Sequence, residues 1–267
     1  MGDKPRDFPA SFERLKFMAR IFSKPGEDAP SINPDAVLDF FEQRAAKAGV
    51  LGPTRAVIYQ DKHADLAERR DAAEKALMLP KMDIHATDRI VDVGCGTGRW
   101  AETLLPLGAY YHGCDVSPGL IEIARERYKA FDNARFSVAP GKGVSLEALD
   151  ETEAFNKILV FGIFLYMNDD DAERAMQAIC GLAAAQCRFV LREPIGLENR
   201  LTIKEHFSED MDQTYNAIYR TEAELFALID GTFGKAGFSL QDSGDVYADS
   251  GLNNRAETRQ RWYVFSR

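Results

Sequence analysis

Residues 90–100 read IVDVGCGTGRW, an apolar run followed by three glycines on alternate positions and then by the start of a helical pattern. The apolar run predicts a buried strand, and the glycines predict a sharp turn from that strand into a helix. Gly94, Gly96 and Gly98 also let a ligand lie directly against the backbone. The segment therefore predicts a ligand-binding strand, loop and helix of an α/β fold.

Two acidic residues narrow the choice of ligand. The loop is GxGxG rather than the GxGxxG of dinucleotide folds, and the carboxylate of Asp92 would sit badly beside a pyrophosphate. Asp92 suits a ligand with an ammonium group, such as the methionine part of S-adenosylmethionine. Asp115, at the tip of the next predicted strand, can accept hydrogen bonds from both ribose hydroxyls. The structural alternatives are a turn partner for Asp92 and a helix N-cap for Asp115.

Short apolar runs alternate with longer helical patterns from residue 88 onward, which indicates βαβ units and a parallel sheet. Strands are predicted at 89–93, 110–116, 135–138, 157–161 and 188–192, and helices at 99–107, 118–129 and 169–185. A helix at 222–235 and strands at 238–247 and 257–265 follow. A short turn between these two closing strands would make an antiparallel hairpin at the sheet edge.

Residues 92–98 together with Asp115 resemble the class I S-adenosylmethionine-dependent methyltransferases, and the likeness continues through 155–161 and 189–194. It covers the chain from about residue 88 to the C-terminus. The resemblance implies a doubly wound α/β fold with a seven-stranded, mostly parallel sheet and an antiparallel terminal hairpin. It also implies S-adenosylmethionine as methyl donor, S-adenosylhomocysteine as product and no metal.

The resemblance extends to individual cofactor contacts. Many relatives carry an acidic residue after the third strand, where this chain has Ala139 and Pro140, so backbone amides are expected to hold the adenine. Tyr59 and Arg70 come from the segment before the domain, and an arginine fork pairs well with the methionine carboxylate. A solvated surface arginine is the alternative. The full predicted set is Asp92, Gly94, Cys95, Gly96, Gly98, Asp115, Val116, Ser117, Pro140, Gly141, Phe161, Gly162, Tyr59 and Arg70.

Residues 1–85 are predicted to form an N-terminal helical cap on a cofactor-binding domain at 86–267. Within the cap, 1–31 is the least regular part: apolar residues from Phe12 to Phe22 have near-helical spacing, which predicts a helix packed on the domain or on a second subunit. The second arrangement would make a homodimer. Helices are also predicted from Pro34 and from residue 64 to 79, the latter ended by Pro80.

The acceptor site is predicted at the carboxyl ends of the strands, under a lid formed by the insertion 195–220. Tyr215 and Tyr219 stand four apart, on one face of an expected helix. His206 is the first candidate for a general base, because its ordinary pKa lies near neutrality, and Tyr215, Tyr219 and Glu193 are its rivals. The candidate acceptor contacts are Tyr166, Arg192, Arg200, Lys204 and Arg220, with core packing or surface ion pairs as the alternatives.

Composition excludes several other classes. The 267 residues are 45% hydrophobic and carry a net charge of −9, which argues against nucleic acid or an anionic membrane as partner. No apolar run reaches the roughly 18 residues of a membrane helix, and the four cysteines and four histidines have no metal-ligand spacing. Reduced thiols and no signal-peptide pattern at the N-terminus indicate a cytoplasmic location.

The sequence thus predicts methyl transfer to an oxygen or nitrogen of a small acceptor, either sugar-like or carrying phosphate or carboxylate. Two rivals stay open. A non-catalytic methyltransferase-like module would bind S-adenosylmethionine without turning it over. An NAD(P)-dependent oxidoreductase would need the glycine loop to accept a pyrophosphate beside Asp92.

Overall fold

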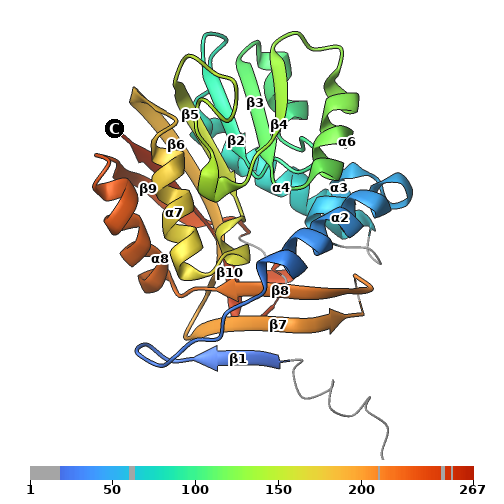
Figure 1. Ribbon diagram of the computed structural model, residues 1–267, viewed down its shortest axis with the longest axis vertical. Helices are drawn as coiled ribbons and strands as arrows, with labels where there is room; N and C mark the ends of the chain where they lie inside the picture. Colours follow the sequence, from blue (N-terminus) through green and yellow to red (C-terminus); the bar gives the residue numbers. More distant parts are fainter. Residues whose placement is uncertain (1–18, 60–63, 210, 248–249, 254) are drawn as a thin grey trace, which may run out of the picture.

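A seven-stranded sheet forms the centre of the computed structural model, which describes residues 19–59, 64–209, 211–247, 250–253 and 255–267. Its strand order is β4-β3-β2-β5-β6-β10-β9 (Figure 1). Strands β2 to β6 run parallel to one another, whereas β10 is antiparallel to both β6 and β9. The predicted doubly wound α/β class is confirmed.

The bounds of the elements follow the sequence closely around the glycine loop. The strands of the large sheet are β2 (Arg89–Val93), β3 (Tyr110–Asp115), β4 (Ala134–Val138), β5 (Phe155–Phe161), β6 (Ala183–Gly196), β9 (Ser239–Asp245) and β10 (Thr258–Ser266). The helices are α2 (Pro34–Leu51), α3 (Pro53–Ile58), α4 (Ala64–Met82), α5 (Ala101–Leu104), α6 (Pro118–Tyr128), α7 (Asp169–Cys180) and α8 (Glu222–Ile229). Short helical turns are η1 (Leu105–Leu107), η2 (Gly141–Gly143), η3 (Phe164–Tyr166), η4 (Asp230–Gly234) and η5 (Ser250–Leu252).

Alternate strand residues enter two different cores, as a sheet covered on both faces requires. Val91 and Val93 pack in one core with residues of α7 and α8, whereas Ile90, which precedes Val91, packs in the other with residues of α4 and α6. Of the four free cysteines, Cys180 alone is not fully buried. None of the helices in the described ranges combines the length and apolarity that crossing a bilayer requires.

A second, three-stranded sheet in the order β1-β7-β8 lies at one end of the molecule, beside α2 (Figure 1). Its strands are β1 (Ala19–Ser23), β7 (Arg200–Ser208) and β8 (Gln213–Tyr219). Arg44 of α2 is fully buried and donates to the carbonyls of Ala56 and Arg55 and to the side chain of Gln213. One side chain thereby joins α2, α3 and the small sheet.

The N-terminal helix predicted through Ile21 and Phe22 is wrong where the structure describes it. These two residues lie in β1 and pair with Thr202 and Leu201 of β7. The pairing partners are far along the chain, and local spacing carries no information about them. The rest of the apolar cluster, Phe12, Leu15, Phe17 and Met18, lies outside the described residues.

The helix expected in the insertion is also wrong, because residues 200–219 form the antiparallel pair β7 and β8. Positions i and i+4 share a face in a strand as well as in a helix. Tyr215 and Tyr219 therefore still point the same way, and both are buried. The four-residue spacing correctly predicted that the two rings lie on one face, but it could not distinguish a strand from a helix.

Several element ends differ from their predictions. Pro80 does not end α4, which runs to Met82; the proline stands in the last turn, and the full burial of Met78 and Met82 offsets its cost. Helix α7 ends at Cys180, so 183–185 belong to β6. The connection between β9 and β10 spans 246–257 instead of a short turn.

Candidate functional site

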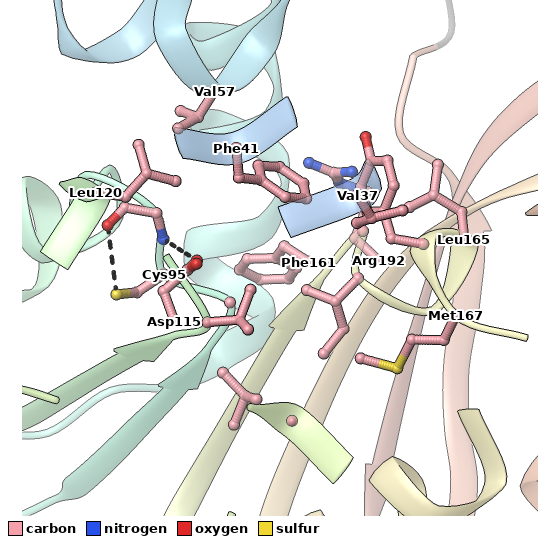
Figure 2. A pocket seen from close by; sticks show the side chains of 18 of the residues that line it. Val37, Phe41, Val57, Cys95, Asp115, Leu120, Phe161, Leu165, Met167 and Arg192 are labelled. Atoms are coloured by element: carbon pink, nitrogen blue, oxygen red, sulfur yellow. Dashed lines mark hydrogen bonds between the residues drawn. The ribbon is translucent and has the colours of Figure 1, made fainter. Parts of the chain in front are cut away.

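A cavity of about 260 Å³ opens at the carboxyl ends of β2, β3 and β5. The glycine loop and Asp92 line this cavity. Figure 2 shows Asp115 and Phe161 on its floor and Val37 and Phe41 of α2 on its roof. Ligands of open α/β sheets bind in this crevice, where helices and loops from successive units meet. The cavity therefore coincides with the place predicted from the sequence.

The loop itself is tightly packed. Gly94, Gly96 and Gly98 have φ of +80°, +55° and +74°, in the region that favours glycine. A Cβ at Gly94 would stand 2.2 Å from Cγ2 of Ile163. Gly94 and Cys95 line the cavity with Gly96, but Gly98 does not; a Cβ there would stand 2.7 Å from the ring of Tyr128. Gly98 thus lets the loop pack on α6.

Asp115 is held rigidly by backbone donors. Its Oδ2 accepts from the N–H of Gly96 at 2.9 Å, and its Oδ1 accepts from the N–H of Ser117 at 3.0 Å (Figure 2 shows the first). Burial raises the pKa of Asp115, and these two N–H groups oppose part of the rise. The helix N-cap of α6 is Ser117, which accepts from Leu120, so Asp115 is not needed for capping. Lone pairs of Asp115 remain for a ligand in the cavity.

Ser117 does not line the cavity but ties it to α2. Its hydroxyl donates to Oε1 of Glu42 at 2.5 Å. Glu42 therefore fixes α2 against the start of α6, beside Asp115. This contact explains how a segment that precedes the domain comes to roof its ligand site.

Asp92 is the second buried carboxyl of the cavity. It accepts a hydrogen bond from the hydroxyl of Tyr111 at 2.6 Å. Burial raises its pKa to about 7, although Tyr111 and the charge of Arg99 lower it. Near neutral pH this carboxyl is poised to ionise in response to a cation.

A buried ion network closes the same end. Glu74 of α4 contacts Arg99, and its Oε2 lies 3.2 Å from a guanidinium nitrogen of Arg192. Arg70, one turn earlier on α4, donates through Nε to the carbonyl of Leu252 at 2.7 Å. One terminal nitrogen of Arg70 is buried without a hydrogen-bond partner in the described structure. An unsatisfied buried guanidinium nitrogen beside a cavity is the donor that a carboxylate ligand would satisfy.

The remaining predicted cofactor contacts also line the cavity. Pro140 and Gly141 follow β4, Val116 follows Asp115, and Phe161 and Gly162 end β5. Tyr59 caps the C-terminus of α3 with φ of +62° and enters the cavity from the roof. Of the fourteen predicted contacts, twelve line this one space.

Four tyrosines surround the other end of the cavity: Tyr59, Tyr166, Tyr215 and Tyr219. The hydroxyls of Tyr166 and Tyr215 are 3.4 Å apart, and those of Tyr215 and Tyr219 are 3.0 Å apart. Burial raises the pKa of Tyr59 to about 12 and that of Tyr215 well above its usual range. The hydroxyls of Tyr59 and Tyr215 therefore stay protonated at neutral pH.

Several predicted catalytic and acceptor residues lie outside the cavity lining. His206 of β7 pairs in register with Tyr215, but its side chain is not among those that line the space. Lys204 lies on the same strand, also outside. Arg200 and Arg220 both bind Asp169, at 2.8 Å and 2.7 Å. These ion pairs connect the small sheet to the start of α7.

Glu193 is buried but also stands behind the cavity wall. Its Oε1 accepts from the N–H of Leu165 at 2.6 Å, and its Oε2 has no hydrogen-bond partner in the described structure. Burial raises its pKa to about 7, against the lowering effect of Arg192. Glu193 thereby holds η3, which carries Tyr166.

Sequence reasoning missed several residues of the wall. Arg99 directly follows the glycine loop, so its position next to that motif could have predicted that it lines the cavity. Tyr247 follows β9 and Gln260 lies in β10, and no local pattern marks either of them. Arg255 donates to the hydroxyl of Tyr219 at 2.8 Å from an irregular segment.

Part of the chain matches a known family of sequences. Residues 90–185 match the family model described as "Methyltransferase domain". A segment of 72 residues is 33% identical to a demethylmenaquinone methyltransferase of Tropheryma whipplei and covers 27% of this chain. Another of 81 residues is 33% identical to a ubiquinone biosynthesis O-methyltransferase of Azorhizobium caulinodans and covers 30% of this chain. The chain spans about 30% of the length of these curated relatives.

Solved structures agree on the fold. Phosphoethanolamine N-methyltransferase 1 of Haemonchus contortus, in complex with phosphoethanolamine and S-adenosylhomocysteine, superimposes with a TM-score of 0.66 at 14% identity, over 88% of this chain and 50% of that one. A 1,6-didemethyltoxoflavin-N1-methyltransferase of Burkholderia thailandensis gives 0.59 at 16% identity, over 99% of both chains. The cyclase SpnF gives 0.63 at 14% identity, over 90% of this chain and 98% of its own. The chain has the class I methyltransferase fold.

Proposed function

We propose that this chain, with a methyltransferase domain at residues 90–185 in a class I methyltransferase fold, moves the methyl group of S-adenosylmethionine to an oxygen or nitrogen of a small molecule. The fold alone does not establish methyl transfer, because a cyclase has the same fold. The observation that carries it is the pair of buried carboxyls, Asp92 and Asp115, at adjacent strand ends around a glycine loop in one cavity.

The donor set fits the parts of this cofactor. Asp115 would accept from the ribose hydroxyls, Asp92 would face the ammonium group, and the unpartnered nitrogen of Arg70 would donate to the carboxylate. Pro140 and Gly141 would border the adenine. When bound, S-adenosylmethionine would supply an already activated methyl group, so the chain has to align the acceptor and exclude water.

The cover over the acceptor is proposed to combine two segments. We assign residues 1–85 to the cap and 86–267 to the cofactor domain, with 195–220 as the lid. The described part supports this division, because α2 and β8 both contribute to the aromatic end of the cavity. A roof of this kind suits a small acceptor.

The tyrosines are proposed to position the acceptor and not to remove its proton. Burial keeps Tyr166 and Tyr215 protonated, since it raises their pKa well above the usual range. An acceptor that is already unprotonated at the methylated atom needs no base. The role of His206 as a base stays a prediction, because its side chain does not line the cavity.

The test is transfer of a radiolabelled methyl group from S-adenosylmethionine to a panel of phenols, amines and ring nitrogens, with and without carboxylate or phosphate groups. The proposal expects label in an acceptor-derived product and an equal amount of S-adenosylhomocysteine. Tight binding of S-adenosylmethionine with no transfer to any member would instead favour a binding module.

Cofactor affinity is expected to depend on pH through Asp92. Its pKa of about 7 lies above the ordinary value because the carboxyl is buried. The ammonium group of the ligand binds the ionised carboxylate of Asp92 more tightly than the neutral carboxyl. The affinity for S-adenosylhomocysteine should therefore rise by about ten-fold as pH rises from 5.5 to 7. The ligand's α-amine, with an ordinary pKa of about 8, stays protonated in this window. Calorimetric titration at each pH measures the effect.

The matched control is Asp92→Asn, which should bind more weakly at pH 7 and show a flat pH profile over the same window. An unchanged slope in Asp92→Asn would assign the titration to another group and remove Asp92 from the ammonium site.

A further inference from the structure

The hydroxyls of three tyrosines form one connected chain. The hydroxyl of Tyr166 is within hydrogen-bond distance of that of Tyr215, which in turn reaches Tyr219. Arg255 donates to the hydroxyl of Tyr219 at 2.8 Å. The chain therefore begins at a cation and runs along the wall of the cavity.

Counting protons shows what this chain can offer a ligand. Three hydroxyls carry three protons, and the two hydrogen bonds between them use two. Arg255 can only donate, so it takes up none of these protons. Whatever the direction of each bond, one hydroxyl proton is left to donate, and all three rings line the cavity. The chain therefore always has one donor available to a ligand.

The charge at this end is positive. Arg255 is half-buried, lies over the rings of Tyr215 and Tyr219, and has no carboxylate within 4 Å among the residues that the structure describes. The charge of Glu257 acts on Arg255, but that carboxylate is in contact with Arg20. A guanidinium that has no carboxylate in contact within the described residues favours negative charge beside the hydroxyls.

Four of the other arginines at or near the cavity are held in ion pairs. Arg200 and Arg220 bind Asp169, and Arg99 and Arg192 bind Glu74. Of the acceptor cations expected from the sequence, Arg192, Arg200 and Arg220 are thus engaged in ion pairs. Arg255 adds a positive charge beside Tyr219, and Arg44 lies over the ring of Tyr59.

We propose that the tyrosine hydroxyls bind an oxyanion, a carboxylate or phosphate of the acceptor molecule, with Arg255 as the positioning residue behind Tyr219. The proposal rests on the proposed function, since it names the class of acceptor for the same cavity. The oxyanion is an anchor and is distinct from the atom that receives the methyl group. Burial favours this assignment, because it keeps the hydroxyls protonated as donors.

The test compares benzoate with benzamide, which has nearly the same shape but no charge, and adds inorganic phosphate as a second anion. Each probe is titrated into the protein saturated with S-adenosylhomocysteine, at pH 7.5. We expect benzoate to bind at least ten-fold more tightly than benzamide. Whether phosphate or benzoate binds more tightly distinguishes the two kinds of oxyanion.

Arg255→Gln should reduce the preference for benzoate at least five-fold, and Arg255→Lys should restore part of it. A merely structural role would weaken both probes equally. Tyr215→Phe keeps the ring, breaks the chain of hydroxyls and should reduce the preference as well. Arg259→Gln removes a charge from an exposed pair with Asp245 and serves as the matched control.

Affinity for S-adenosylhomocysteine separates this proposal from the proposed function. If that ligand binds but benzamide binds as well as benzoate, or if neither benzoate nor phosphate binds, the oxyanion site is wrong and the cofactor site stands. If S-adenosylhomocysteine fails to bind a folded chain, the proposed function itself fails. Unchanged selectivity in a folded Arg255→Gln would also overturn the proposal.

Discussion

Asp115→Ala is expected to weaken the binding of S-adenosylhomocysteine at least a hundred-fold, about 3 kcal/mol. The change removes the only charged group that we assign to the ribose, and charge-assisted hydrogen bonds contribute about 1.5–3 kcal/mol each. It also leaves the N–H groups of Gly96 and Ser117 without their acceptor, so the loop loses its fixed shape. Isothermal titration calorimetry measures the affinity directly.

Asp132→Ala is the matched control, because Asp132 is an exposed aspartate on the turn before β4. It should bind S-adenosylhomocysteine like the unmodified chain. Thermal unfolding without ligand shows whether Asp115→Ala is folded. A folded Asp115→Ala that binds within about three-fold of the unmodified chain would contradict the assignment of the ribose site.

Gly94→Ala is expected to lower the free energy of unfolding by about 2–4 kcal/mol and to abolish measurable cofactor binding. Two costs add. Left-handed backbone, with φ of +80°, costs an L residue about 1–2 kcal/mol. The new Cβ would also stand 2.2 Å from Ile163, so that side chain or the loop has to move within the cavity.

Two other glycines separate these costs. Gly26 has φ of +85° and no atom within 4 Å of an added Cβ, so Gly26→Ala should show the backbone cost alone. Gly231 has neither feature, and Gly231→Ala should be nearly neutral. Adding Ile163→Ala to Gly94→Ala should recover part of the stability. If chemical denaturation shows equal losses for Gly94→Ala and Gly26→Ala, close packing of the loop is not what requires glycine.

The parts of the fold that were predictable from the sequence depend on neighbours in the chain. The bounds of β2 and the place of the glycine loop follow from one continuous segment, and Asp115 follows from the end of the next strand. Backbone geometry carries such signals, because a strand that turns into a helix within a few residues needs glycine at fixed positions. Twelve of the predicted cofactor contacts accordingly line one cavity.

The parts that were not predictable depend on distant partners. Asp169 pairs with both Arg200 and Arg220 from 31 and 51 positions away, so the sequence showed two free cations where the structure has two arginines that share one carboxylate. Strand β1 exists because it pairs with β7, and its own apolar spacing suited a helix equally well. Arg255 has no motif at all; its role comes from Tyr219, which the fold brings beside it.

The central claim is that the cavity at the ends of β2 and β3 is shaped for a cationic adenosyl amino acid and not for a dinucleotide. Calorimetric titration of the intact chain with S-adenosylmethionine, S-adenosylhomocysteine and NAD at pH 7.5 tests it most directly. We expect both sulfur compounds to bind with one site per chain and NAD to give no saturable heat. Saturable binding of NAD, or no binding of either sulfur compound by protein that unfolds cooperatively, would contradict the claim.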